Sequence, residues 1–239
     1  YNTLQSIASK TLEKGDHESY DYIASFGQLL QYAMDVDESL VTLSKEIEHA
    51  QRYLDLQSIR YECEIVCETD IAPDLLNMLI PKMSLQPLVE NSLLHGRLYE
   101  KNDGRILLRA AVLGEEILVE VADNGVPMSL RQQELQREKM EKLKSDYQHL
   151  KNASAETIGM ESLLSKDGEK ELLEQTVEAH HGAHIGLSNV FARFLLRFGS
   201  KCRFVMEANS FGGTSVKAYL PRERVKIVCA DSAEGGNEI

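Results

Sequence analysis

The sequence contains no tryptophan, five prolines and four cysteines among its 239 residues. It has no run of about 18 apolar residues, so it predicts no membrane-spanning helix, and it shows no secretory signal pattern. Acidic residues outnumber basic ones by 38 to 26, and the net charge of −12 argues against nucleic-acid binding. The cysteines form no CxxC pair, which favours free thiols in a reducing compartment. Because the first residue is Tyr1, we expect the chain to be part of a longer protein.

The first sixty residues have the periodicity of helices. Apolar residues at helical spacing predict a short helix over 1–12 and two longer ones through about 23–33 and 43–61. The polar segment 35–39 separates the longer two, and we expect them to form a helical hairpin with its apolar seam in a bundle. Residues 1–61 are therefore predicted to form a helical region whose beginning lies upstream.

The sequence changes character at about residue 62. The alternation in "ECEIVCE" predicts a half-buried strand, and "IPKMSLQPLVENSLLHG" predicts a helix. Two further segments, "RILLRAAVL" and "EEILVEVAD", predict a β-hairpin joined through Gly114, and a later helix is expected to end at Gly199 before a last strand pair. Strands that cluster in hairpins favour an α+β sandwich over residues 62–221, with helices on one face of a mixed sheet.

Two segments are expected to lie outside this core. Residues 130–183 are highly charged, and we expect a mobile insertion or lid that contains an exposed helix and a second short one near 163–174. The tail, residues 222–239, is polar at its end, although "VKIVCA" within it could add a strand.

The segment "LQPLVENSLLHG" places Glu90, Asn91 and His95 within an apolar helix. Asn91 and His95 lie four residues apart, so their side chains share one stripe of the helix. An amide oxygen suits Mg²⁺ that is bound mostly through phosphates and water. Taken alone, this pattern is explained more simply by a solvated helix edge.

Three later segments each give a weak signal. Asp123 ends a predicted buried strand, where a carboxylate can accept a hydrogen bond from an exocyclic amine, and Gly125 allows a ligand to approach closely. Taken alone, an ordinary Asp-Asn-Gly turn is the better explanation of these residues. Gly186 precedes a helix whose free N–H groups favour an anion. The pair Gly212–Gly213 predicts a hairpin turn before Thr214.

The order and spacing of these segments resemble the ATP-binding domain of the GHKL superfamily, and most closely the sensor histidine kinases of the LytS/YesM type. The N-box of that family, L-Q-P-L-V-E-N-A-x-x-H-G, matches "LQPLVENSLLHG", with Ser92 in place of alanine. Its next box begins D-N-G-x-G-M, which matches "DNGVPM", and its glycine box, I-G-L-x-N-V-x-x-R, matches "IGLSNVFAR". Its last box, G-G-T, is also present. The segment "LSKEIEHAQRYLDLQSIRY" resembles the family's second dimerisation helix, so the resemblance covers about residues 1–221.

The resemblance implies a role for each matching residue. Asn91 would ligate Mg²⁺ on ATP, Glu90 would act beside it as a base or water holder, and His95 would lie near the phosphates. Asp123 would bind the adenine amine, and Gly125 would make room for the ring. The other nucleotide-binding residues would be Gly186, Leu187, Asn189 and Arg193 around the phosphates and Gly212, Gly213 and Thr214 at the adenine end.

Two departures from the family pattern affect the lid. Pro127 stands where the family usually has glycine, and proline fixes φ and removes an N–H donor. The segment between the second and third boxes is also long, so the behaviour of the family's lid cannot be transferred to this chain.

The family's phosphoacceptor histidine lies in a segment like N-P-H-F-L-[FY]-N-T-L. Because "YNTLQSIA" matches this motif from its aromatic residue onward, we expect the acceptor about three residues upstream of Tyr1. His49 is the alternative within the chain, but we expect it to be a helix-surface residue. The cluster "HHGAH", residues 180–184, could bind a metal, although the end of a lid is the simpler interpretation.

The resemblance implies the catalytic part of a two-component protein histidine kinase. The full protein would pass phosphate from ATP to its own histidine and then to an aspartate of a response regulator. It would form a homodimer through the helical region and be the cytoplasmic portion of a bacterial inner-membrane protein, with membrane contact only through upstream segments. The present chain alone should not autophosphorylate.

Two other functions remain open at this stage. One is a nucleotide-binding signalling module without kinase activity, which only Pro127 supports. The other is a gyrase- or Hsp90-like ATPase, which is less favoured because only about 19 residues follow Leu220 and such machines need a large further domain.

Overall fold

A computed structural model gives the structure of residues 2–34, 39–158 and 185–228. The predicted short helix near 163–174 and the histidine cluster at 180–184 lie outside these ranges, as does the end of the tail. Within the described part of the chain, no helix is long and apolar enough to span a membrane.

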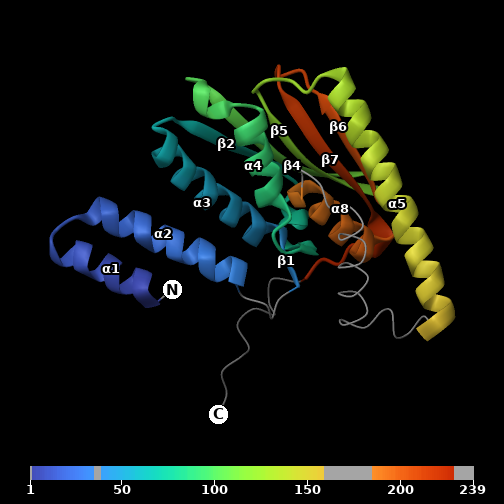
Figure 1. Ribbon diagram of the computed structural model, residues 1–239, viewed down its shortest axis with the longest axis horizontal. Coiled ribbons are helices and arrows are strands. Elements are labelled where there is room, and N and C mark those ends of the chain that lie inside the picture. The colour runs from blue at the N-terminus through green and yellow to red at the C-terminus, as the bar shows by residue number, and fades with distance from the viewer. Residues whose placement is uncertain (1, 35–38, 159–184, 229–239) are drawn as a thin grey trace, which may run out of the picture.

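A five-stranded mixed sheet with the strand order β2-β4-β5-β7-β6 forms the centre of the fold (Figure 1). Strands β2 and β4 are parallel, and every other neighbouring pair in this sheet is antiparallel. Both predicted hairpins are therefore present, because β4 pairs with β5 and β6 pairs with β7. The strands are β2 (Ile65–Ile71), β4 (Gly104–Leu113), β5 (Glu116–Asp123), β6 (Arg203–Ala208) and β7 (Thr214–Pro221).

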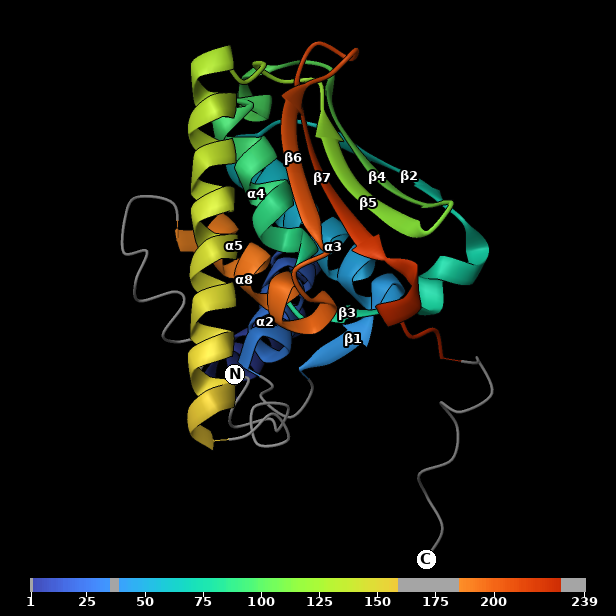
Figure 2. The same cartoon turned by 90° about the vertical axis from the view of Figure 1, so that its right-hand side faces the viewer.

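Helices cover one face of this sheet, as Figure 2 shows. They are α3 (Leu43–Tyr61), α4 (Leu85–His95) and α8 (Ile185–Phe198), and short 3₁₀ turns at Pro73–Asn77, Leu98–Glu100 and Arg222–Arg224 complete the connections. Apolar side chains from these helices and from the sheet form one core, which confirms the predicted α+β sandwich. Its most buried members include Leu85, Val89, Leu93, Ile106, Leu108, Val121, Phe191, Phe194 and Phe198.

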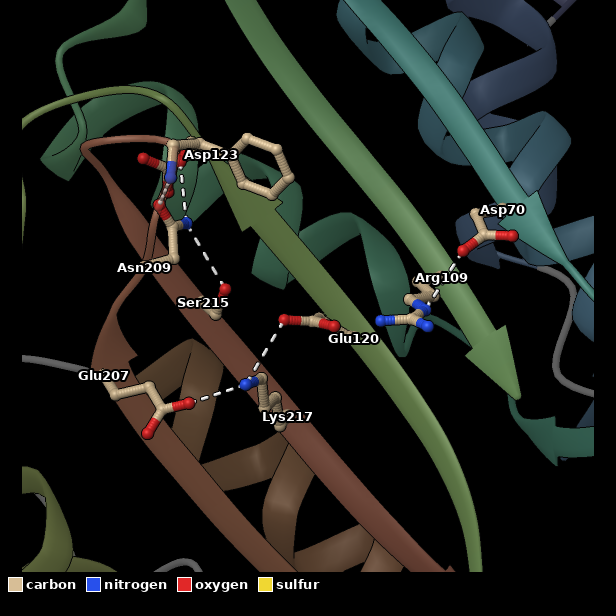
Figure 3. Close-up of polar contacts among 9 residues, drawn as sticks. Asp70, Arg109, Glu120, Asp123, Glu207, Asn209, Ser215 and Lys217 are labelled. Carbon is tan, nitrogen blue, oxygen red and sulfur yellow. Dashed lines mark hydrogen bonds and ion pairs between the residues drawn. The ribbon is translucent and has the colours of Figure 1, made fainter. Parts of the chain in front are cut away.

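The other face of the sheet is lined with polar side chains, because neighbours along a strand point to opposite faces. Arg109 pairs with Asp70 at 3.0 Å, and the Nζ of Lys217 lies 2.6 Å from Glu207 and 3.7 Å from Glu120 (Figure 3). The Arg109–Asp70 pair is exposed and contributes little stability, whereas Glu120 is buried beside Lys217.

Two helical pairings are present in the first sixty residues. Helices α1 (Asn2–Glu13) and α2 (His17–Met34) form a tight hairpin, with Gly15 at φ +76° in the turn between them (Figure 1). Helix α2 also packs against α3, as the predicted pairing of the 23–33 and 43–61 helices requires, because Arg52 bonds Gln28 and the Tyr32 hydroxyl bonds Glu46. The apolar seam of α3 also joins the core against α4 and β2, which helical spacing did not predict, since it identifies an apolar face and not its partner.

The start of α4 also differs from the prediction. Residues Leu79–Pro81 form β3, which pairs antiparallel with β1 (Leu40–Thr42), and the helix begins only at Leu85. Between them Met83 adopts a left-handed conformation, with φ at 60°. A residue in this region cannot continue a right-handed helix, so the predicted helix was too long at its start.

The long helix α5 (Leu130–Ile158) is present as predicted, but its role differs from the prediction. It packs along β6 and α8, and Leu143 and Tyr147 are buried in the core (Figure 2). These two apolar residues lie four apart, so one narrow stripe of an otherwise charged helix faces the protein. The prediction that this part of the insertion carries no core is therefore wrong.

His49 is not a helix-surface residue, which corrects a further prediction. Its side chain is 5% exposed, and its ring stacks on that of Tyr32 with centroids 4.2 Å apart. Its Nε2 lies 2.5 Å from Oε1 of Gln86 in α4. Burial lowers the pKa of His49, because a charged imidazolium is poorly solvated there.

Candidate functional site

A cavity of about 310 Å³ lies where α4, the end of β5, the start of α5 and the start of α8 meet. Five of the residues that the sequence proposed for a site line it. These are Asn91, His95, Asp123, Leu187 and Thr214. Segments far apart in the sequence thus form one concave site, as the order of the motifs predicts.

Asp123 is the buried anionic group of this cavity. Its Oδ1 accepts hydrogen bonds from the backbone N–H of Gly125 at 2.9 Å and of Thr214 at 3.2 Å, and the side chain of Ser92 also bonds the carboxylate. Burial raises the pKa of the Asp123 carboxyl, while these bonds and the nearby charge of Lys101 act in the opposite direction. Its orientation is therefore fixed by the backbone of two other segments.

Three glycines allow the chain to close tightly around Asp123. A Cβ on Gly213 would lie within 3.0 Å of both the carbonyl oxygen and Oδ1 of Asp123, and one on Gly125 within 3.0 Å of the Gly96 carbonyl. A Cβ on Gly96 would lie 3.1 Å from Oδ1 of Asp123. Close approach requires all three glycines, whereas the sequence analysis proposed this reason for Gly125 alone.

The side chains of α4 divide between two directions. Asn91 and His95 line the cavity, as their shared helical stripe predicts. Glu90 is exposed and does not line it, and its charge acts on Tyr53 of α3. The structure therefore separates Glu90 from the two residues that we expected beside it.

Thr214 ties the loop after β5, residues 124–129, to the start of β7. Its Oγ1 accepts a hydrogen bond from the backbone N–H of Met128 at 3.0 Å, and the N–H of Val126 donates to Gly96 at 2.8 Å. Pro127 lies between these two donors and lines the cavity. Proline has no N–H to donate, but the backbone N–H groups of both neighbouring residues, Val126 and Met128, are hydrogen-bonded. The loop is therefore still bonded to β7 and to the end of α4.

The glycine-box residues do not all face the cavity. Leu187 lines it, while Gly186 is exposed at the start of α8 and lies outside the lining. Asn189 has a buried Oδ1 without a hydrogen-bond partner among the described residues. Arg193 is turned away, because its guanidinium donates to the carbonyls of Lys82 and Met83. Burial lowers the pKa of Arg193, and the charge of Glu46 opposes this shift.

The last box acts through its turn. Gly212 has φ at 92° and Gly213 touches Asp123, but neither lines the cavity. Asn209, which the sequence analysis missed, holds this turn: its Oδ1 accepts from the N–H of Phe211 and of Gly213, and its Nδ2 donates to the carbonyl of Asp123 (Figure 3). An asparagine that opens a Gly-rich turn is a recognisable signal for this local bonding.

Helix α5 supplies a wall that no motif predicted. Gln132, Leu135 and Gln136 line the cavity from its first turns. No cluster of three or more His, Cys, Asp or Glu side chains suited to a metal occurs in the described ranges.

Comparison with known proteins agrees with the motifs. Residues 1–65 match the family model described as "Histidine kinase". Sensor protein kinase HptS of Staphylococcus aureus, from strains USA300 and NCTC 8325 / PS 47, is 28% identical over 150 residues. The match covers 63% of this chain and 28% of HptS, so the chain spans less than a third of the length of these relatives.

Similar solved structures are also histidine kinases by their descriptions. The catalytic domain of ThkA is 12% identical with a TM-score of 0.43, over 77% of this chain and 94% of that one. The mycobacterial sensor histidine kinase MprB is 14% identical with a TM-score of 0.43, over 79% and 98%. The family match over residues 1–65, the HptS relatives and the four sequence boxes thus agree that this chain is similar to sensor histidine kinases.

Proposed function

We propose that the cavity binds Mg-ATP and that the protein to which this chain belongs transfers the γ-phosphate to a histidine. The observation that carries this proposal is the arrangement around Asp123. Two backbone donors bond its Oδ1 and the Ser92 side chain also bonds the carboxylate, which leaves a lone pair of the carboxylate to accept a hydrogen bond in the cavity. An adenine amine is the kind of donor that such a fixed carboxylate selects.

The phosphate end of the nucleotide would lie along α4 and the start of α8. Asn91 offers one neutral oxygen, which suits Mg²⁺ that keeps phosphate and water as its other ligands. The bound ion would screen the charge of the γ-phosphate. The buried, unpaired Oδ1 of Asn189 adds an acceptor that a ligand-bound water could satisfy, and Gly186 leaves the first turn of α8 open to an anion.

We infer that Glu90 acts on the acceptor side. It lies on α4 outside the cavity, and its charge acts on Tyr53. A histidine that reached this exposed side of α4 would meet Glu90 before it met the nucleotide, so Glu90 would hold or remove the proton of that histidine. Arg193 would support the site indirectly, through the backbone that precedes α4.

The activity of the whole protein extends this proposal. The histidine would lie upstream of Tyr1, and its phosphate would pass to an aspartate of a response regulator. The α1–α2 hairpin would join two copies into a homodimer. The match of residues 1–65 to the family model supports these assignments. A signalling module without kinase activity gains no support, because the ties of the loop around Pro127 remain intact.

Nucleotide binding can be tested by calorimetry with MgADP on the 239-residue chain. Asn91→Ala and Asp123→Ala should each weaken binding roughly tenfold or more, since each removes a polar contact made in the cavity. Glu90→Gln is the matched control from the same helix and should leave the affinity unchanged. If both alanine variants bind like the parent chain, the site is assigned wrongly.

Kinase activity needs the upstream residues as well. With them restored and Mg-ATP added, we expect phosphate on the protein that is labile to acid and stable to base. The chain that begins at Tyr1 should bind nucleotide and remain unphosphorylated. Binding without phosphohistidine in the longer protein would contradict the kinase proposal while leaving the nucleotide site in place.

A further inference from the structure

The first turn of α4 is capped by a side chain from another helix. Ser84 occupies the N-cap position, but its hydroxyl donates to the carbonyl of Pro81 and caps nothing. The carboxylate of Glu46, in α3, instead accepts the backbone N–H groups of Met83, Ser84 and Leu85 at 2.7, 2.6 and 2.9 Å. Glu46 is fully buried. A carboxylate at a helix N-terminus also interacts favourably with the helix dipole.

The same turn is held from its other side by a cation. Arg193, from α8, donates to the carbonyls of Lys82 and Met83. Met83 is the residue with φ at 60°, a conformation that costs energy in a residue with a side chain. Its N–H faces Glu46 and its carbonyl faces Arg193, so this backbone geometry is fixed by two charged groups of opposite sign.

A tyrosine from α2 reaches the same carboxylate. The Tyr32 hydroxyl donates to Oε1 of Glu46 at 2.6 Å, and this is the oxygen that the Met83 N–H also bonds. The Tyr32 ring lies between the stacked His49 ring and the Nζ of Lys82, which is 4.6 Å from its centroid. The hydroxyl of Tyr32 therefore connects the α1–α2 hairpin directly to the cap of α4.

We propose that Glu46 is a positioning residue of the nucleotide site and that the Tyr32 hydroxyl transmits the placement of α2 to α4 through it. The inference rests on the proposed function, because it concerns the helix that carries Asn91 and His95. Helix α4 is short and continuous from Leu85 to His95, so a shift of its first turn moves both residues relative to Asp123. Such coupling is reciprocal, and bound nucleotide must also stabilise the docking of α2.

The test is hydrogen exchange, followed by mass spectrometry, on the 239-residue chain with and without MgADP. In the parent chain, MgADP should slow exchange in residues 17–34 although they lie outside the cavity. Tyr32→Phe should remove this protection and weaken MgADP binding roughly tenfold, within the usual range for coupled sites. Tyr22→Phe is the matched control, because that hydroxyl bonds only the exposed Glu18 of its own helix at 2.8 Å.

A nucleotide-free arm separates this inference from the proposed function. Without MgADP, Tyr32→Phe and Glu46→Gln should each speed exchange at residues 83–88 several-fold, while strand β5 stays protected. The control is Glu48→Gln, in the same helix as Glu46 but exposed and paired with Arg52, and it should leave exchange at residues 83–88 unchanged. Unchanged exchange at 83–88 in both variants would overturn the coupling. Faster exchange at 83–88 in the two variants, combined with a parent chain that fails to bind MgADP, would overturn only the proposed function.

Discussion

A Cβ atom on Gly125 would lie within 3.0 Å of the carbonyl oxygen of Gly96, so the two glycines bring the turn after β5 against the end of α4. The next residue, Val126, donates its N–H to that same carbonyl at 2.8 Å. This contact sets the spacing between Asp123 on the strand and His95 on the helix. The cavity therefore depends on the absence of two side chains as much as on the polar groups that line it.

Gly125→Ala should destabilise the protein by roughly 1–3 kcal/mol, because the new methyl group overlaps backbone that cannot yield. Gly186→Ala is the matched control, since its Cβ would lie 3.8 Å from Pro87 and alanine favours a helix by up to about 1 kcal/mol. Urea unfolding measures the stability of both variants. Equal stabilities for the two variants would show that the contact between Gly125 and Gly96 is looser than described.

Asp123→Asn should change base preference while leaving the fold intact. The asparagine Oδ1 can keep the bonds from Gly125 and Thr214, but its amino group would face the cavity. Binding of MgADP should fall roughly 10- to 100-fold, and the preference for adenine over guanine should narrow, because the O6 of guanine is an acceptor. Calorimetry with MgADP and MgGDP measures the ratio of the two affinities. Glu120→Gln, on the same strand but the other face of the sheet, should leave this affinity ratio unchanged.

The stability of Asp123→Asn gives a second readout. Burial raises the pKa of Asp123 in the folded protein, so keeping this carboxylate charged at neutral pH costs stability. The neutral variant should unfold at an equal or higher temperature at about pH 7. A clear loss of stability there would mean that the carboxylate is held for structure rather than for a ligand.

His49 should make stability depend on pH. Burial lowers its pKa in the folded protein below the ordinary value of 6.5, so the unfolded chain takes up a proton first. Stability is then fully present above about pH 6.5 and is lost as pH falls through that value. Thermal unfolding of His49→Gln between about pH 7.5 and 5.5 should show a flatter slope than the parent chain. His17→Gln, at an exposed position, serves as the control.

Leu143→Ala should cost roughly 2–4 kcal/mol, because it empties a buried position between α5 and the core. Leu130, at the start of the same helix, is 82% exposed, and Leu130→Ala should stay within about 0.5 kcal/mol of the parent chain. Denaturant unfolding compares them. Equal and small effects would indicate that α5 detaches from the protein in solution.

The sequence allowed most of the sheet and the position of the site to be predicted. Alternation marks strands directly, and Gly114 marks the β4–β5 turn, so both hairpins followed from local signals. The beginning of α4 could not be predicted from local signals, because the residue that caps it, Glu46, lies 38 positions before Ser84. A local rule selects Ser84 as the cap, and only the packing of α3 against α4 shows that its hydroxyl is used elsewhere.

The partners of helical faces were also beyond the sequence. The α3 seam fits a bundle or a sheet equally well, and Leu143 and Tyr147 are too few to mark α5 as a core helix. The family motifs include Asn91 and Asp123, and both residues line one cavity. They gave no sign that Arg193 bonds backbone before α4, since a motif records residue types and not the atoms that they contact.

The bond from the Thr214 N–H to Asp123 joins residues 91 positions apart, and this has a consequence for synthesis. While the ribosome is still making the chain, β5 can pair with β4, but β7, its other neighbour, is absent until residues 214–221 have been made. Before then the Asp123 carboxylate lacks Thr214, Gly213 and Asn209 around it. A nascent chain that stalls before residue 214 would contain the helices that cover the sheet but would lack the residues that complete the surroundings of Asp123. Ligand binding can therefore report that translation has passed residue 214.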